Sequence, residues 1–160
     1  DFQSPNLAGT ATVEVICKFI NFNSYLNAIF GWDQYWVGIF NAPNVIFYTT
    51  EDGANNRMDT SITFNTNEWY YFVFEMRSDV AYTNNKIYIN GQNQSLSQVA
   101  SSENAANRNF NNGNGRISSW LFDNNYNIPM DLAQFRIYNR ALTASEIQQN
   151  YNATKSRFGL

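Results

Sequence analysis

The chain has 160 residues, a formal net charge of −3 and a charged fraction of only 14%, while 17% of its residues are aromatic. The acidic balance and the lack of a basic patch exclude nucleic acid as a partner, because binding to phosphate needs clustered Lys and Arg. No apolar run reaches the roughly 20 residues of a membrane-spanning helix, so we expect no membrane insertion. Since no break in composition divides the chain, we predict one domain over residues 1–160. Its start at Asp1 favours a part of a larger protein.

The first predicted strand covers residues 10–20, TATVEVICKFI. Its apolar side chains alternate with polar ones and share one face: Val13, Val15, Cys17 and Phe19. This period of two predicts a β-strand with one buried face, on which Cys17 is a structural thiol. Two extended runs follow at residues 25–32 and 35–40, and the two residues between them predict a hairpin.

Strand and turn signals continue through the middle of the chain. Residues 44–52 predict a short strand that ends in a loop. The next run, SITF, leads into residues 67–76, NEWYYFVFEM, which are apolar on both faces apart from Glu75 and predict an interior strand of a sheet. Within residues 85–94, the pair Asn90-Gly91 supplies the positive φ values of a type I′ turn and predicts another hairpin.

The remaining strands surround a stretch of turn formers. Residues 99–115 are polar and rich in Asn, so we expect a long surface loop there. Two further strands are predicted at residues 116–123 and 131–140. In total, about nine short strands without repeated helices predict an all-β fold, namely an antiparallel two-sheet β-sandwich or jelly roll.

One short helix is predicted at the end, in residues 139–151, NRALTASEIQQNY. Thr143 and Glu146 have the spacing of a capping box, in which each side chain binds the other residue's backbone N–H. Leu142 and Ile147 have the spacing of a hydrophobic staple. Ile147 and Tyr151 then lie on one helix face, which we expect to rest on the sheet.

Three of these segments, NEWYYFVFEM, KIYINGQ and DLAQFRIYNRALTASEIQQNY, occur in this order over roughly residues 65–155. In this respect the chain resembles the laminin-G-like domains of the concanavalin A-like lectin/glucanase type, and the resemblance implies a two-sheet jelly roll. The ending YNATKSRFGL is similar to copies in structural proteins of tailed bacteriophages and other large viruses. The resemblance therefore also implies a location on a virion surface or elsewhere outside the cell.

We predict that the chain is not an enzyme. The glucanases that it resembles carry three acids on one strand, at alternating positions that share a face, and no strand here has that pattern. The chain contains no His, which removes His-dependent nucleophile systems and His-based metal sites. The run NNGNG lacks the Lys and the following helix of a phosphate-binding loop.

Two clusters of aromatic and amide side chains predict a sugar-binding site. Aromatic rings can stack on the face of a pyranose while amide and carboxylate groups hold its hydroxyls. The candidate residues come from GWDQYW and WLFDNNYN: Trp32, Gln34, Tyr35, Trp36, Trp120, Asn124 and Tyr126. An alternative interpretation is that the tryptophans fill the core or bridge the two sheets. Tyr126, which lies in an Asn-rich loop, is the aromatic residue that we most expect to be exposed.

Calcium is a candidate cofactor, because domains of the resembled kind often bind it through oxygen ligands. Asp52 and Asp123 are the candidate metal ligands, although a full site needs six or more converging oxygens. No other cofactor is predicted.

Two functions remain open at this point. The first is a non-catalytic, lectin-like adhesion module that binds a cell-surface glycan. The second is a structural or decoration domain that contacts neighbouring subunits of a virion without binding sugar, and it includes assembly as a homo-oligomer.

Overall fold

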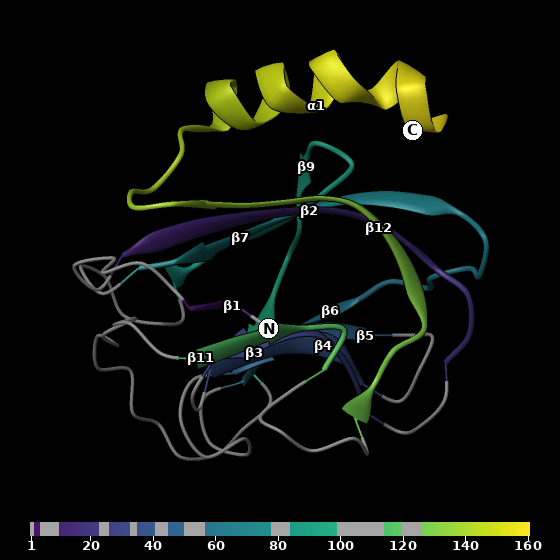
Figure 1. The fold of residues 1–160 in the computed structure, drawn as a ribbon. Helices are drawn as coiled ribbons and strands as arrows, with labels where there is room; N and C mark the ends of the chain where they lie inside the picture. Colours follow the sequence, from purple (N-terminus) through teal and green to yellow (C-terminus); the bar gives the residue numbers. More distant parts are fainter. Residues whose placement is uncertain are drawn as a thin grey trace.

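The structure, a computed structural model, describes residues 2–3, 10–22, 26–32, 35–40, 45–49, 57–77, 84–98, 114–119 and 126–160. Its strands form two antiparallel sheets that pack face to face (Figure 1). The seven-stranded sheet has the order β1 (Phe2–Gln3), β11 (Asn114–Ile117), β3 (Leu26–Trp32), β4 (Tyr35–Phe40), β5 (Val45–Thr49), β6 (Arg57–Ser61) and β10 (Ser97–Gln98). The five-stranded sheet has the order β12 (Met130–Tyr138), β2 (Ala11–Phe19), β7 (Trp69–Met76), β8 (Ile87–Ile89) and β9 (Gln92–Asn93).

The predicted β-sandwich is therefore confirmed, and its main core lies between the two sheets. Strand β2 contributes the predicted apolar face, because Val13, Val15, Cys17 and Phe19 are all fully buried in this core. Phe30 from the opposite sheet meets Phe135 from β12, with ring centroids 5.4 Å apart. Such interleaving of two inner faces is the packing expected of a sandwich.

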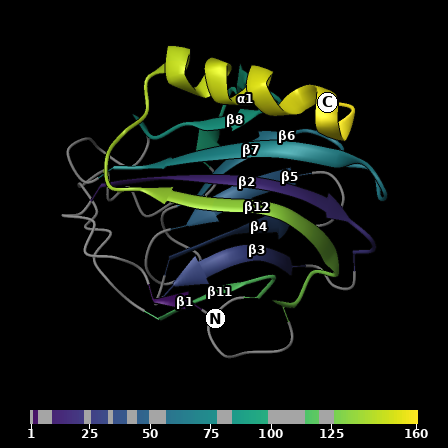
Figure 2. The same ribbon diagram turned by 45° about the horizontal axis from the view of Figure 1, so that its top comes forward.

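The prediction that β2 has a single buried face was wrong. Its other face is covered by helix α1 (Ala144–Phe158), which lies across the outside of the five-stranded sheet (Figures 1 and 2). On that covered face Glu14 and Ile16 are 0% exposed. A second apolar cluster, which includes Tyr71, Leu142 and Ile147, fills the space between helix and sheet.

The interior strand and the hairpin after it agree with the sequence. Strand β7 pairs with β2 on one side and β8 on the other, so it lies inside the sheet. Asn90 and Gly91 have φ values of 50° and 78° and form the β8–β9 turn. A Cβ at Gly91 would also lie 2.7 Å from the ring of Tyr151 on the helix, so both backbone and space require glycine there.

Helix α1 begins with the predicted cap. The Glu146 amide donates to Thr143 Oγ1 at 3.2 Å, and the Thr143 amide donates to Glu146 Oε2 at 2.8 Å. Leu142 and Ile147 are both buried in the cluster beneath the helix, as the predicted staple requires. The helix is longer than predicted, with 15 residues, and ends before Gly159 at φ 70°.

Two other boundaries also differ from the sequence prediction. Strand β6 occupies residues 57–61, so it ends at the first residue of the run SITF, and it pairs with β5. Strand β11 occupies residues 114–117, so it begins inside the predicted loop and ends well before residue 123. In both cases the pairing partner determines where the strand starts, which a local pattern does not contain.

Candidate functional site

Strand pairing brings the described parts of the two predicted sugar-binding clusters together. In the β3–β4 hairpin Trp32 pairs with Tyr35, and Gly31 pairs with Trp36. On its other side β3 pairs with β11, where Trp32 lies opposite Gly115. Of the second cluster the structure describes Tyr126 and Asn127, and Asn127 forms a bridge to Ala28 of β3.

Trp36 lies on the outer face of this sheet and is only 2% exposed. It forms a small cluster with Ala28, and its ring lies over Gly38, where an added Cβ would be 2.9 Å from a ring carbon. Its neighbour Val37 points into the main core instead. Trp36 therefore neither bridges the two sheets nor offers an exposed face to a sugar, and we do not retain it as a ligand contact.

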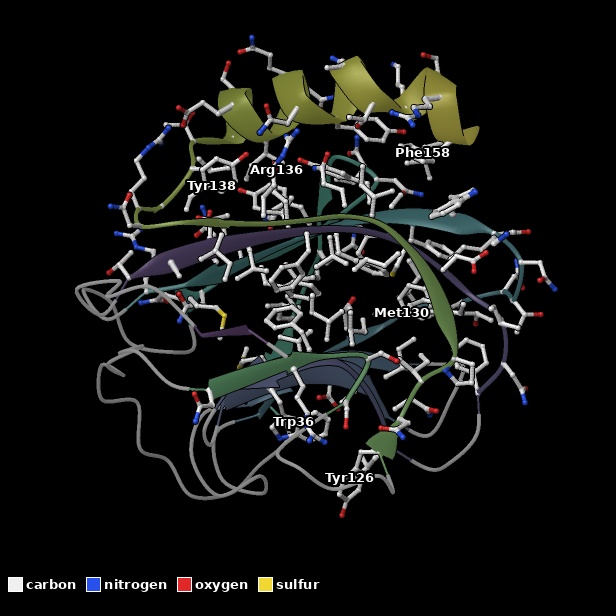
Figure 3. The ribbon with its side chains drawn as sticks, viewed as in Figure 1. Trp36, Tyr126, Met130, Arg136, Tyr138 and Phe158 are labelled. Atoms are coloured by element: carbon white, nitrogen blue, oxygen red, sulfur yellow. The ribbon has the colours of Figure 1, made fainter. Side chains whose placement is uncertain are left out.

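Tyr126 packs against the Trp36 cluster and is half-buried. Figure 3 shows its side chain extending away from the sheet, with the hydroxyl at the outer end. The residue is thus less exposed than the sequence suggested. Tyr126 still combines a fixed aromatic ring with an outward polar end, the arrangement in which a tyrosine at a binding site is most useful.

A hollow of about 470 Å³ lies at this edge of the sheet. We call it the edge hollow, and the residues that line it are Arg116, Ile117, Ser118, Ser119, Asn127, Ile128 and Pro129. It forms where β11 ends and Asn127 takes its place beside β3 through a bridge to Ala28. Its volume is within the range of sites for small molecules.

The backbone around the edge hollow is held by Ser118. This residue has a φ of 66°, a conformation that is uncommon outside Gly, Asn and Asp. Its amide donates to Ile29 O at 2.7 Å, and its hydroxyl donates to Ile128 O at 2.5 Å. The Ile128 amide in turn donates to Ser118 O at 3.2 Å. These bonds keep the two segments that form the hollow in one arrangement.

The other predicted site residues are not described in the same detail. The backbones of Trp32 and Tyr35 belong to β3 and β4. The remaining candidates lie outside the described residues: Gln34, Trp120, Asn124 and the two predicted metal ligands Asp52 and Asp123. Among the residues that the structure describes, no group of three or more His, Cys, Asp or Glu could hold a metal ion. The calcium site stays a prediction.

Sequence reasoning missed one buried polar network, centred on the carboxylate of Glu14 beneath helix α1. Tyr71 donates to Glu14 Oε1 at 2.5 Å, and Asn150 of the helix donates to the same oxygen at 2.8 Å. Tyr138 donates to Oε2 at 2.8 Å, and Arg136 lies 3.7 Å from it. Figure 3 shows Arg136 and Tyr138 in this layer between sheet and helix.

The Glu14 network is structural. Burial and the hydrogen bond to Glu14 raise the pKa of Tyr71 well above its ordinary value, so this phenol remains a donor. Because Glu14 is 0% exposed, a substrate cannot reach the carboxylate. Ile16 was the available signal: an apolar residue on the polar face of β2 indicates that this face is covered as well.

A second hollow, of about 350 Å³, lies where the end of helix α1 meets the start of β7. Trp69 lines it and is half-buried. The ring of Phe158 lies 5.0 Å from that of Trp69, and the amine of Lys18 lies 5.3 Å from the Trp69 centroid. Its aromatic groups thus pack mainly on one another, and we do not choose it as the candidate site.

No helix within the described part of the chain is long and apolar enough to cross a membrane. Similar folds occur among solved structures. The chain is similar to a heptameric pentraxin of the serum-amyloid-P type from Limulus polyphemus, with a TM-score of 0.68 and 12% identity over 88% of this chain and 69% of that one.

Two structures of botulinum neurotoxins are also similar, each with 16% identity over 92% of this chain and 36% of the toxin chain. One is the type C toxin, whose cell entry is described as dependent on two ganglioside molecules, with a TM-score of 0.60. The other is the DC binding domain in complex with rat synaptotagmin II, with a TM-score of 0.59. This chain therefore spans about a third of the toxin chains, and these likenesses establish the fold alone.

No curated protein matches the sequence. The family model described as the concanavalin A-like lectin/glucanases superfamily matches residues 2–148, which is most of the chain. The chain belongs to the concanavalin A-like lectin/glucanase superfamily.

Proposed function

We propose that this domain is a non-catalytic carbohydrate-binding module that attaches to a glycan through the edge hollow. The observation that carries the proposal is the packing of Tyr126, from the second aromatic and amide cluster, against the cluster of Trp36 from the first, directly before Asn127 in the lining of the hollow. Tyr126, which directly precedes Asn127 of the lining, supplies an aromatic ring, and Asn127 supplies an exposed amide group. The lining combines polar side chains with the apolar residues Ile117 and Pro129.

The lining of the edge hollow supports binding without catalysis. Hydrolysis of a glycosidic bond needs two carboxyl groups on opposite sides of that bond. Among the described residues that line the hollow there is no Asp or Glu. Glu14 lies on the other sheet, where it is buried under helix α1.

The location that we propose is a virion surface or another extracellular surface, where adhesion to a glycan is useful. Its support is the similarity of the C-terminal segment to viral structural proteins. Tyr126 lies on the face away from helix α1. The helix side is therefore left for contact with the rest of an assembly.

The test is a glycan array with the purified domain, followed by affinity measurement on any glycan bound. Tyr126→Ala should weaken binding by about tenfold, the effect of losing about 1.4 kcal/mol of aromatic contact. Phe158→Ala is the matched control, because it removes a half-buried ring on the opposite side of the molecule. If no glycan binds to the folded protein, the proposal is wrong.

A second candidate function is assembly with a second copy of this chain. Strand β12 lies at the end of the five-stranded sheet, and an unpaired edge can pair with its own copy about a two-fold axis. Two hydrophobic side chains near this edge, Ile20 and Leu132, are 48% and 42% exposed. The Ile20 amide donates to Pro129 O, which places Ile20 next to the start of β12. Light scattering should then give a dimer mass that Leu132→Lys reduces to that of a monomer; a monomer at all concentrations would exclude this function.

A further inference from the structure

Among the described residues that line the edge hollow, Arg116 is the one charged side chain, and its charge is positive. Arg116 lies on β11 opposite Gly31, which itself lies opposite Trp36 on β4. Directly paired residues of adjacent strands point to the same face of a sheet. Arg116 therefore shares the outer face with Trp36, and Gly31 places no side chain between them.

The surroundings of Arg116 strengthen its interaction with an anion. The residue is half-buried, and Ile117, Ile128 and Pro129 form the apolar part of the lining. Charges in such surroundings attract one another more strongly than charges in open water, and salt screens them less. A guanidinium has five N–H donors, so it can keep a contact within the protein and still offer a pair of donors to a carboxylate.

The remaining lining suits a hydroxylated molecule. Asn127 is exposed, and Ser118 is fixed by hydrogen bonds through its amide, carbonyl and hydroxyl groups. Tyr126 precedes Asn127 in the chain, and its side chain extends away from the sheet with its polar end outward. A ligand that fits this lining has a carboxylate, several hydroxyl or amide groups, and an apolar ring face.

From these features we propose that the edge hollow binds a sugar that carries a carboxylate, such as a sialic or uronic acid at the end of a glycan. Arg116 binds the carboxylate through paired N–H groups, and Tyr126 packs against the ring. This inference rests on the proposed function and gives it a ligand class. The net charge of −3 attracts no anion from a distance, so selectivity for the acid must come from contact with Arg116.

The decisive measurement uses wild-type protein and pairs of glycans that differ only in the terminal acidic sugar. We expect the acidic member to bind at least tenfold more tightly, because the neutral member lacks the carboxylate that would accept hydrogen bonds from Arg116. Equal or tighter binding of the neutral member overturns the acidic ligand class but leaves the carbohydrate-binding function standing. If neither member nor any other glycan binds, the proposed function itself fails.

Variants then assign the selectivity to Arg116. Arg116→Gln should remove the tenfold preference. Arg116→Lys should retain only part of it, because lysine keeps the positive charge but cannot donate two parallel N–H bonds to a carboxylate. Arg157→Gln is the matched control: it removes an exposed positive charge on helix α1, on the opposite side of the molecule. If Arg116→Gln folds and still prefers the acidic glycan, Arg116 is not its ligand.

Discussion

Removal of a single phenol oxygen under helix α1 should measurably destabilise the domain. The change is Tyr71→Phe, which removes one of the hydrogen bonds to Glu14 and keeps the ring in its cluster. Glu14 is 0% exposed, so water does not replace the lost donor. A hydrogen bond to a buried charged group contributes about 2–3 kcal/mol. For a domain of this size we expect the melting temperature to fall by roughly 4–12 °C.

Thermal and urea unfolding followed by circular dichroism would measure this loss. Tyr151→Phe is the control, because it makes the same chemical change at the same interface, and the Tyr151 hydroxyl bonds to no residue that the structure describes. The control should change the unfolding free energy by less than about 0.5 kcal/mol. Equal effects of the two substitutions would refute the role of Glu14.

The double variant Tyr71→Phe/Tyr138→Phe tests whether the network acts as a unit. The two tyrosines donate to different oxygens of one carboxylate. After both substitutions, the hydrogen-bond donor left to the carboxylate among the described side chains is Asn150, and Arg136 lies 3.7 Å away. The double variant should therefore lose more unfolding free energy than the sum of the two single variants. A strictly additive result would mean that the two bonds are independent.

Three further predictions concern the helix and the turn beneath it. Ile147→Asp should lower the unfolding free energy by about 3 kcal/mol or more, because Ile147 is 0% exposed and the new carboxylate would have no partner. Urea unfolding measures this loss, and Gln149→Asp on the exposed face of the helix is the control. Gly91→Ala should cost about 1–3 kcal/mol by the same measurement, since φ is 78° and the added carbon meets Tyr151; unchanged stability would show that the turn can move away from the helix. The hydrogen bonds from Arg140, and then those from Thr143, lower the pKa of Glu146 from 4.5 to about 2. Because the folded value is the lower one, this contribution to stability is complete above pH 4.5 and is lost as the pH falls towards 2. Wild type should therefore lose more stability than Glu146→Gln across that range in pH-dependent melts, and parallel curves would contradict the assignment.

Much of the fold was predictable from signals that act over a few residues. The alternation of Val13, Val15 and Cys17, the Asn90-Gly91 turn and the Thr143–Glu146 cap all depend on neighbours within four positions. Each of these appears in the structure where the pattern predicts it. The signal is local in each case, although the burial of Val13, Val15 and Cys17 is stabilised by contacts with the opposite sheet.

The errors come from interactions that no local pattern contains. Helix α1 continues past the predicted end because Tyr151 and Phe158 pack on Tyr71 and Trp69 of the sheet, and such packing stabilises a helix more than intrinsic propensity does. Trp36 was expected at a binding surface, yet the cluster with Tyr126 covers it. Whether an aromatic side chain is exposed depends on what another segment places over it.

The sequence by itself determined the strand pattern, the hairpin turns and the capped helix, and it indicated the superfamily. Only the tertiary structure decided that Glu14 lies in a buried network, whose hydrogen bonds join residues 57, 124 and 136 positions apart. Only the tertiary structure placed Arg116 and the Tyr126 segment around one hollow, through the pairing of β11 and Asn127 with β3. Burial and convergence arise from contacts between distant segments, so they become visible only after the two sheets and the helix have packed.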